Sequence, residues 1–197
     1  MKIKIGGHRV KVKIYEHFAT CVSNIGTCDP GSNTINLTKT YDQYKLCEDK
    51  YIETLLHEVL HFIDYVYCDY VMEECDIKNI SKYLFYVFNR NDLFNLPDKV
   101  DIVGFNYNVK YSHKFLGDTE DTYISFSTVD QTISINNTDN MCDDYIKVGL
   151  LVGVLKILYT EFIDSKVFLD VIPAFAQGIF QVISDNKKLR KMFKWGK

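Results

Sequence analysis

The chain repeats itself once, and this repeat limits the folds that it can adopt. Similar residues recur in the same order at an offset of about 94 to 98 positions. The clearest pairs are Thr34-Ile35-Asn36-Leu37 with Thr132-Ile133-Ser134-Ile135, and Asn91 with Asn186. A repeat of this length indicates one structural unit used twice. We therefore expect two similar halves, residues 1–96 and 97–197, which meet at Pro97.

Each half contains strand patterns followed by two long helical patterns. Short runs that alternate between apolar and polar residues indicate strands, and longer runs with apolar residues every three or four positions indicate helices. Strands are expected at residues 10–15, 34–37, 107–111, 123–127 and 132–136, and helices at about 47–67, 72–89, 141–163 and 167–184. This order predicts an α+β fold in which each half is a small antiparallel sheet followed by two helices.

The first long helix carries the sequence His57-Glu58-Val59-Leu60-His61. Residues four apart lie one above the other on a helix, so the two imidazoles can share one metal ion. Glu58 stands where a carboxylate can reach a water molecule beside that metal. The spacing is typical of a zinc hydrolase. Two ordinary, partly buried histidines are the alternative, but buried imidazoles need polar partners and a metal supplies both at once.

A catalytic zinc site usually has a third protein ligand. Asp64 lies nearly two turns beyond His57, so we expect it to support the site through a hydrogen bond rather than to bind the metal. Glu73 and Glu74 are better candidates, because a short connection folds the second helix back against the first. The apolar stripe of that helix places Glu73 nearer its centre, yet both residues can reach inward. The residue pattern leaves the choice between them open.

Residues 54–64, together with Glu73, Glu74 and Ile77, resemble the small phage and mobile-element metallopeptidases of the ImmA/IrrE-like and SprT-like gluzincin group. The resemblance covers about residues 48–94 well and the preceding strands loosely. It implies a zincin-like half with bound Zn²⁺, in which Glu58 is the catalytic base of peptide hydrolysis. In the family pattern, a glutamate ligand stands three residues before a small or apolar residue, here Ile77. The resemblance therefore implies Glu74 as the third ligand, with Glu73 as the alternate.

The second half has no counterpart of the metal site, although members of this group usually have a single copy. When Tyr51 is aligned with Tyr145, the three site positions fall on Leu151, Val152 and Leu155. The second copy is thus expected to keep the helix and to lack the metal.

Two glycines in this second-half helix, Gly149 and Gly153, would let another element approach closely. We expect the helix to pack against the first half in a pseudo-two-fold arrangement.

The composition excludes several classes of protein. Apolar residues make up 47% of the 197 residues, which is enough for a packed core. The net charge is -3 and the pI is about 5.9, so we expect no nucleic-acid partner. No segment has the length and apolar character of a signal peptide or a membrane span, so we expect a cytoplasmic protein without a membrane partner, in the host cytoplasm if a phage encodes it.

Two functions remain open at this stage. The first is a zinc-dependent peptidase that hydrolyses a protein or peptide through a metal-activated water. The second is a catalytically silent binding or inhibitory protein that keeps the zinc site for structure. The substrate or target, the oxyanion stabiliser and the oligomeric state stay undetermined, and a monomer with internal pseudo-two-fold symmetry suits the repeat.

Overall fold

The computed structural model describes residues 1–18, 24–112, 123–137, 141–163 and 169–193. It confirms an α+β fold with two similar halves. The first half contains β1 (Lys2–Ile5), β2 (His8–Tyr15), β3 (Gly26–Asp29), β4 (Thr34–Thr38), the short strands β5 (Thr40–Tyr41) and β6 (Tyr44–Lys45), α1 (Glu48–Tyr67), α2 (Glu74–Arg90) and the 3-10 helix η1 (Leu93–Asn95). The second half contains β7 (Lys99–Ile102), β8 (Phe105–Ser112), β9 (Ile124–Ser127), β10 (Thr132–Asn136), α3 (Asp143–Phe162), α4 (Ile172–Asp185) and α5 (Lys187–Met192).

Each half has a four-stranded sheet with the same strand order. The orders are β1-β2-β4-β3 and β7-β8-β10-β9. The outer pairs are antiparallel, but the central pairs β2–β4 and β8–β10 are parallel. The sheets are therefore mixed rather than antiparallel as we predicted. In each half, β3 or β9 forms the edge of the sheet and comes before the central strand β4 or β10 in the chain. The hairpin that follows β3 or β9 places β4 or β10 next to β2 or β8 and parallel to it.

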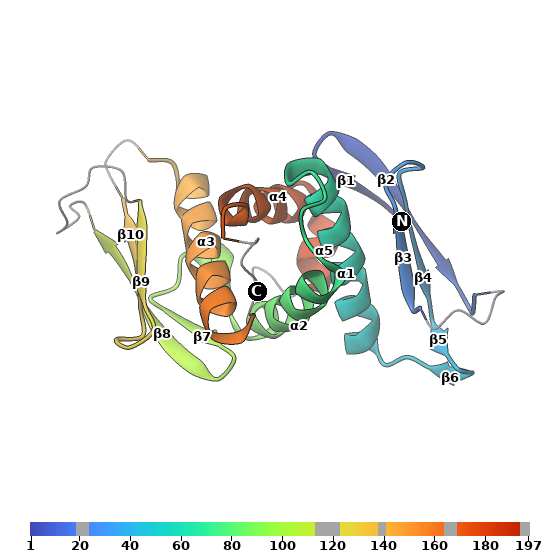
Figure 1. Ribbon diagram of the computed structural model, residues 1–197, viewed down its shortest axis with the longest axis horizontal. Helices are drawn as coiled ribbons and strands as arrows, with labels where there is room; N and C mark the ends of the chain where they lie inside the picture. Colours follow the sequence, from blue (N-terminus) through green and yellow to red (C-terminus); the bar gives the residue numbers. More distant parts are fainter. Residues whose placement is uncertain (19–23, 113–122, 138–140, 164–168, 194–197) are drawn as a thin grey trace.

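The strands alternate between buried and exposed residues because a helix covers only one face of each sheet. In β1 and β2 the apolar residues Ile3, Ile5, Val10 and Val12 are buried, and the intervening basic residues are not. Helix α1 covers the inner face of the first sheet, and α3 covers that of the second. Figure 1 shows the sheets at opposite ends of the molecule with the helices between them.

Helices α2 and α4 each pack against the long helix of their own half and also contact the other half. Helix α4 of the second half packs against α1 and β1, and α2 of the first half packs against β7 and α3. Gly178 in α4 permits this closeness, because a Cβ atom there would lie 2.6 Å from Ile63 Cγ2 and 2.9 Å from Tyr67 Cδ2. These contacts are reciprocal between the halves, and a pseudo-two-fold relation stays a prediction. The expectation that Gly149 and Gly153 face the first half is wrong, because they face Tyr123 and Ile133 of their own half, and the close approach between the halves occurs at Gly178.

Two asparagines connect the halves in the same way. The Asn91 side chain accepts from the Asp101 backbone N–H (2.7 Å) and donates to its carbonyl (2.8 Å). The Asn186 side chain does the same with Lys4, at 2.8 Å in both contacts. Asn91 follows α2 and Asn186 follows α4, so each half binds the first strand of the other. We call this pair the asparagine clamps.

Three details differ from the sequence expectations. The two long helices start 95 residues apart, at Glu48 and Asp143, rather than 94 apart. The structural counterparts of His57, Glu58 and His61 are therefore Val152, Gly153 and Lys156. Helix α4 begins at Ile172 with Pro173 in its first turn, whereas the predicted start at residue 167 lies outside the described residues. The four-residue strands β1, β3 and β7 were missed, although β1 and β7 alternate between polar and buried apolar residues.

None of the described helices combines the length and the apolar character that a membrane-crossing segment needs.

Candidate metal centre

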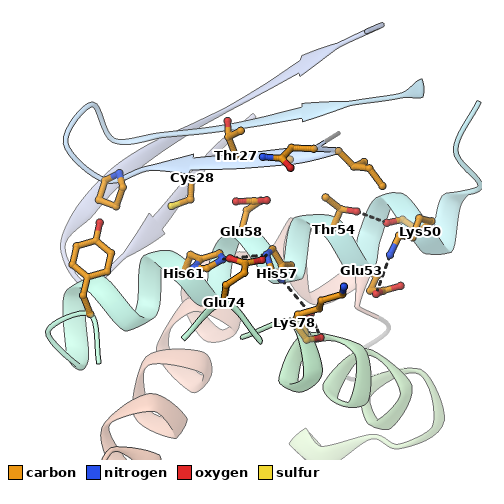
Figure 2. Close-up of a pocket in the computed structure, with 16 residues that line it drawn as sticks. Thr27, Cys28, Lys50, Glu53, Thr54, His57, Glu58, His61, Glu74 and Lys78 are labelled. Carbon is orange, nitrogen blue, oxygen red and sulfur yellow. Dashed lines mark hydrogen bonds and ion pairs between the residues drawn. The ribbon is translucent and has the colours of Figure 1, made fainter. Parts of the chain in front are cut away.

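His57, His61 and Glu74 form a compact group where α1 meets the start of α2 (Figure 2). The Nε2 atoms of the two histidines are 3.1 Å apart. Glu74 Oε1 lies 3.2 Å from His57 Nε2, and Glu74 Oε2 lies 3.0 Å from His61 Nε2. The two histidine side chains are about a fifth exposed and the Glu74 side chain is 71% exposed, so the group is open to solvent on one side.

The turn between the helices brings Glu74 to the histidines. Asp69 and Tyr70 adopt left-handed backbone conformations with φ of 54° and 60°, which reverse the chain after α1. Glu73 then caps α2 in an extended conformation, and Glu74 is the first helical residue. Glu73 points elsewhere, with its carboxylate 3.6 Å from Cys75 Sγ. Within the described chain, the metal-binding group therefore includes Glu74 and not Glu73.

Asp64 supports this turn and does not contact the histidines. It is buried, and its backbone carbonyl accepts from the N–H groups of Cys68 and Tyr70. Burial raises the pKa of its carboxyl to about 6, although the backbone N–H groups of Met72 and Val71 stabilise the charged form. The carboxylate thus faces the backbone just before Glu74. Asp64 therefore contacts the turn that carries Glu74, and its supporting role at the site stays a prediction.

The spacing of the three donors suits a tetrahedral zinc ion. Four ligands at about 2.1 Å from zinc hold neighbouring donor atoms roughly 3.4 Å apart. The three observed separations, 3.1, 3.2 and 3.0 Å, are close to that edge length. Two imidazoles and one carboxylate are also a common donor set for catalytic zinc. The three residues could therefore hold a metal ion, and the donor set and spacing are compatible with zinc.

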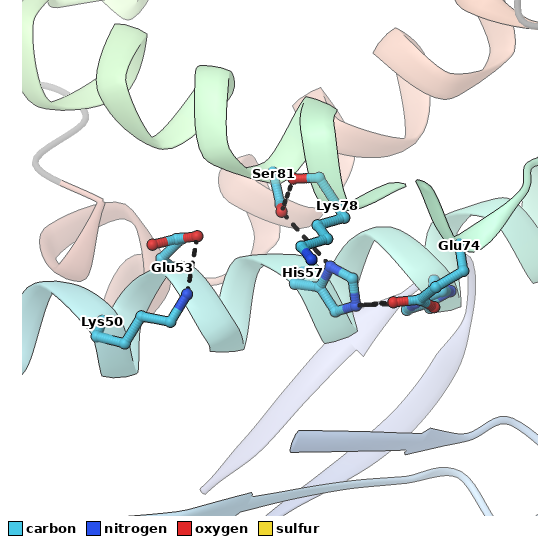
Figure 3. A network of polar contacts seen from close by, with 7 residues as sticks. Lys50, Glu53, His57, Glu74, Lys78 and Ser81 are labelled. Carbon is cyan, nitrogen blue, oxygen red and sulfur yellow. Dashed lines mark hydrogen bonds and ion pairs between the residues drawn. The ribbon is translucent and has the colours of Figure 1, made fainter. Parts of the chain in front are cut away.

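The electrostatics of the group favour a cation among these atoms. Burial, and then the neighbouring His61, lowers the pKa of His57, and burial lowers that of His61. The imidazoles are thus neutral. Ser81 Oγ donates to the Lys78 carbonyl at 2.9 Å and can only accept from His57 Nδ1, at a long 3.5 Å. His57 Nε2, on the other edge of the ring, faces the Glu74 carboxylate (Figure 3), and a proton on Nδ1 would leave that nitrogen free to bind a cation.

Glu58 points from α1 towards β3 and lines the same cavity as His57, His61 and Glu74 (Figure 2). Its side chain is buried, and burial followed by the charge of Glu74 raises its pKa to about 8. Gly26 in β3 makes the space that it occupies. A Cβ atom at Gly26 would lie 2.5 Å from Glu58 Oε1 and 2.9 Å from Thr54 Cγ2. Glu58 therefore fits beside the two histidines because the facing strand has no side chain there.

We expect Gly26→Ala to displace the Glu58 carboxylate and leave the three metal ligands in place. Since a misplacement of about 1 Å can cost on the order of a hundred-fold in rate, any reaction that uses Glu58 as its base should slow by about one to two orders of magnitude. Zinc content, measured by elemental analysis, should not change. Gly31→Ala is the matched control, because its nearest neighbour is 3.4 Å away. Equal activity of both variants would show that Glu58 does not need this space.

A cavity of about 650 Å³ surrounds the group. It is bordered by β3 on one side and by α1 and the start of α2 on the other. One end carries the Lys50–Glu53 ion pair at 3.1 Å, and Tyr70 lines the cavity as well. The Cys28 thiol also faces it, and burial, then the charges of Glu58 and Asp29, raises its pKa to about 12. Cys28 therefore lines the cavity as a neutral thiol.

Two residues of this site were not found by sequence reasoning. Ser81 lies two turns after Glu74 on the same face of α2, and that spacing could have identified it. Gly26 could not have been identified, because its role depends on a strand pairing far from Glu58 in the chain. In the second half, Ile124 occupies the position of Gly26 and Gly153 that of Glu58, so the bulky and small residues are exchanged.

Comparisons of the chain with models of known protein families, with curated proteins and with solved structures found no match. The chemistry of this site is therefore inferred from its own residues and geometry.

Proposed function

We propose that this protein is a zinc-dependent peptidase that hydrolyses a protein or peptide substrate. The observation that carries the proposal is the spacing of His57, His61 and Glu74, which matches three ligands of a tetrahedral zinc ion beside the buried carboxylate of Glu58. The group opens into a cavity large enough for a peptide segment.

The residues of the site have separable roles in this proposal. Zinc held by His57, His61 and Glu74 would polarise a scissile carbonyl and lower the pKa of a water molecule beside it. A cation held by the ligands would lower the raised pKa of Glu58, and the resulting carboxylate would accept a proton from the attacking water and pass it to the leaving nitrogen. Ser81 would keep the Nε2 atom of His57 unprotonated, and Asp64 would hold the turn that carries Glu74.

The position of β3 beside the cavity is an argument for a peptide substrate. β3 is an outermost strand of its sheet and borders the cavity opposite the helices. An edge strand leaves backbone N–H and C=O groups available, and an extended peptide can pair with them. A peptide so bound would pass over the metal ligands and Glu58. The argument applies to the first half alone, because α3 has no metal-binding side chains at the positions that correspond to His57 and His61.

Zinc removal is expected to abolish hydrolysis without unfolding the chain. One zinc per chain should be found after expression with zinc available, and a chelator should remove both the metal and the cleavage of a peptide library. Most of the core lies away from the site, so the far-ultraviolet circular dichroism at room temperature should not change. The melting temperature should fall by roughly 10 °C, as expected for loss of a ligand worth about 4 kcal/mol.

The second candidate is a silent binding protein with a structural metal. It is favoured by one observation, the loss of all three site positions in the second half, which shows that this fold persists without the site. A chelator that unfolds the chain at room temperature, with no cleavage of the library before its addition, would support this candidate and contradict the peptidase.

A further inference from the structure

We infer that the outer face of the first sheet binds the phosphate backbone of nucleic acid. This inference is independent of the metal site. Five basic side chains project from β1 and β2 on the face that α1 does not cover: Lys2, Lys4, Arg9, Lys11 and Lys13. We call this set the basic face. Figure 1 shows that this side of the sheet points away from all the helices.

The basic face is formed by strand alternation and by the pairing register. The apolar partners of these residues point toward α1, so every second position on β1 and β2 points outward. Lys2 pairs with Lys11 and Lys4 pairs with Arg9 across the two strands. Lys13 continues the row along β2, next to Asn36 of β4. The five positive charges are therefore regularly spaced on one face of the sheet.

The protein supplies little compensating charge. Like charges directly opposite each other in a sheet are destabilising, and two such pairs occur here in succession. Within the described chain, no ion pair joins any of the five to a carboxylate. The acid on the same face is Asp29 at the far edge, where hydrogen bonds from Ser32 lower its pKa most and the charge of Lys13 contributes less. An external anion would relieve this repulsion.

The second sheet provides an internal comparison. Its structurally equivalent pairs are Lys99 with Asn108 and Asp101 with Asn106, and Lys110 corresponds to Lys13. That face has two basic residues and one acidic residue, whereas the first has five basic residues in the same positions. The fold therefore does not require the charges. The chain-wide net charge of -3 conceals this face, because acidic residues elsewhere outweigh it.

The arrangement suits a polymer with a regularly repeated negative charge. Outward residues along β2 are about 6.8 Å apart, since a strand rises about 3.4 Å per residue, and they form a straight row of cations. Long lysine and arginine side chains can adjust to successive phosphates. The exposed Tyr15 at the end of the row adds an aromatic ring on which a base can stack. These features favour single-stranded nucleic acid and sequence-independent binding.

Binding is tested with the full chain and a labelled oligo(dT) of about 20 nucleotides, measured by fluorescence anisotropy. Four to five phosphate contacts predict a slope of about -3 for log K against log salt, and so roughly fifty-fold weaker binding at 200 mM than at 50 mM salt. The variant R9Q/K11Q should weaken binding at least ten-fold. The matched variant K99Q/K110Q removes the same charge from the second sheet and should bind like the natural chain.

Thermal melting distinguishes loss of binding from loss of fold. Since R9Q/K11Q removes repulsion between Lys2 and Lys11 and between Lys4 and Arg9, its melting temperature should equal or exceed that of the natural chain. Absence of binding at 50 mM salt, or equal weakening by both double variants, would overturn the proposal. Tighter binding to phosphatidylserine vesicles or to polyglutamate than to oligo(dT), with the same dependence on Arg9 and Lys11, would also overturn it in favour of a membrane or an acidic protein.

Discussion

Glu58→Gln is expected to lower peptide hydrolysis by on the order of a thousand-fold or more while one zinc ion stays bound to each chain. Glutamine has the shape of the carboxyl group and fits the same space beside Gly26, but it cannot accept a proton from water. The metal ligands are not altered. Rates on a peptide that the natural chain cleaves, together with elemental analysis of both proteins, measure the two effects separately.

A matched control exists on the same helix. Glu53 also lines the cavity, one turn before His57 on the same face of α1, but its carboxylate is engaged with Lys50 at 3.1 Å. Glu53→Gln should therefore keep both zinc and most of the activity. Full activity of Glu58→Gln would remove Glu58 from the mechanism. Loss of zinc in that variant would instead assign Glu58 to metal binding, contrary to the ligand set that we propose.

Separating the two halves should abolish folding. Residues 1–96 and 97–197, produced as separate chains, are each expected to lack a cooperative thermal transition at micromolar concentration, a loss of about 5 to 15 kcal/mol of stability. Each would expose surface that the other covers. Aromatic pairs cross between the halves at Tyr83–Phe162, Phe88–Phe193 and Phe94–Phe180, with ring centroids 5.1, 6.3 and 5.5 Å apart. Mixing the two fragments should restore the transition.

Circular dichroism melts of each fragment and of the equimolar mixture test this directly. A folded monomer of residues 1–96 that binds zinc would show that the first half is an independent domain, and would contradict the expected dependence of each half on the other. Within the intact chain, Asn186→Ala leaves the N–H and carbonyl of Lys4 without their partner, so the melting temperature should fall by roughly 5 to 10 °C. Asn89→Ala, just before the other asparagine clamp, is the control.

Some features of the fold and of the candidate site could be predicted from patterns in the sequence. The positions of His57 and His61 follow from the helical period, because residues four apart always share a face. The repeat predicted two similar halves, and Asn91 and Asn186 do occupy equivalent places in both. Strand alternation likewise placed Ile35 and Leu37 in the core. The helical period and the strand alternation depend on residues close together in the sequence, and the repeat follows from comparing the two halves in order.

Other features depended on the path of the chain through space. Periodicity favoured Glu73 because it treated that residue as helical, whereas the turn ends with Glu73 in an extended conformation and starts α2 at Glu74. The alignment on Tyr51 and Tyr145 was one residue out, because the helices begin at equivalent caps, Cys47 and Cys142, which are 95 residues apart.

By itself, the sequence determined the doubled α+β plan and the two histidines on one helical face, since both follow from repeat and period. The tertiary structure decided which glutamate joins them, that Gly26 makes room for Glu58, that α2 and α4 contact both halves, and that five basic residues share one sheet face. These depend on turn conformation, strand register and packing between distant segments. Such contacts arise only when the whole chain is folded, and the spacing of neighbouring residues does not encode them.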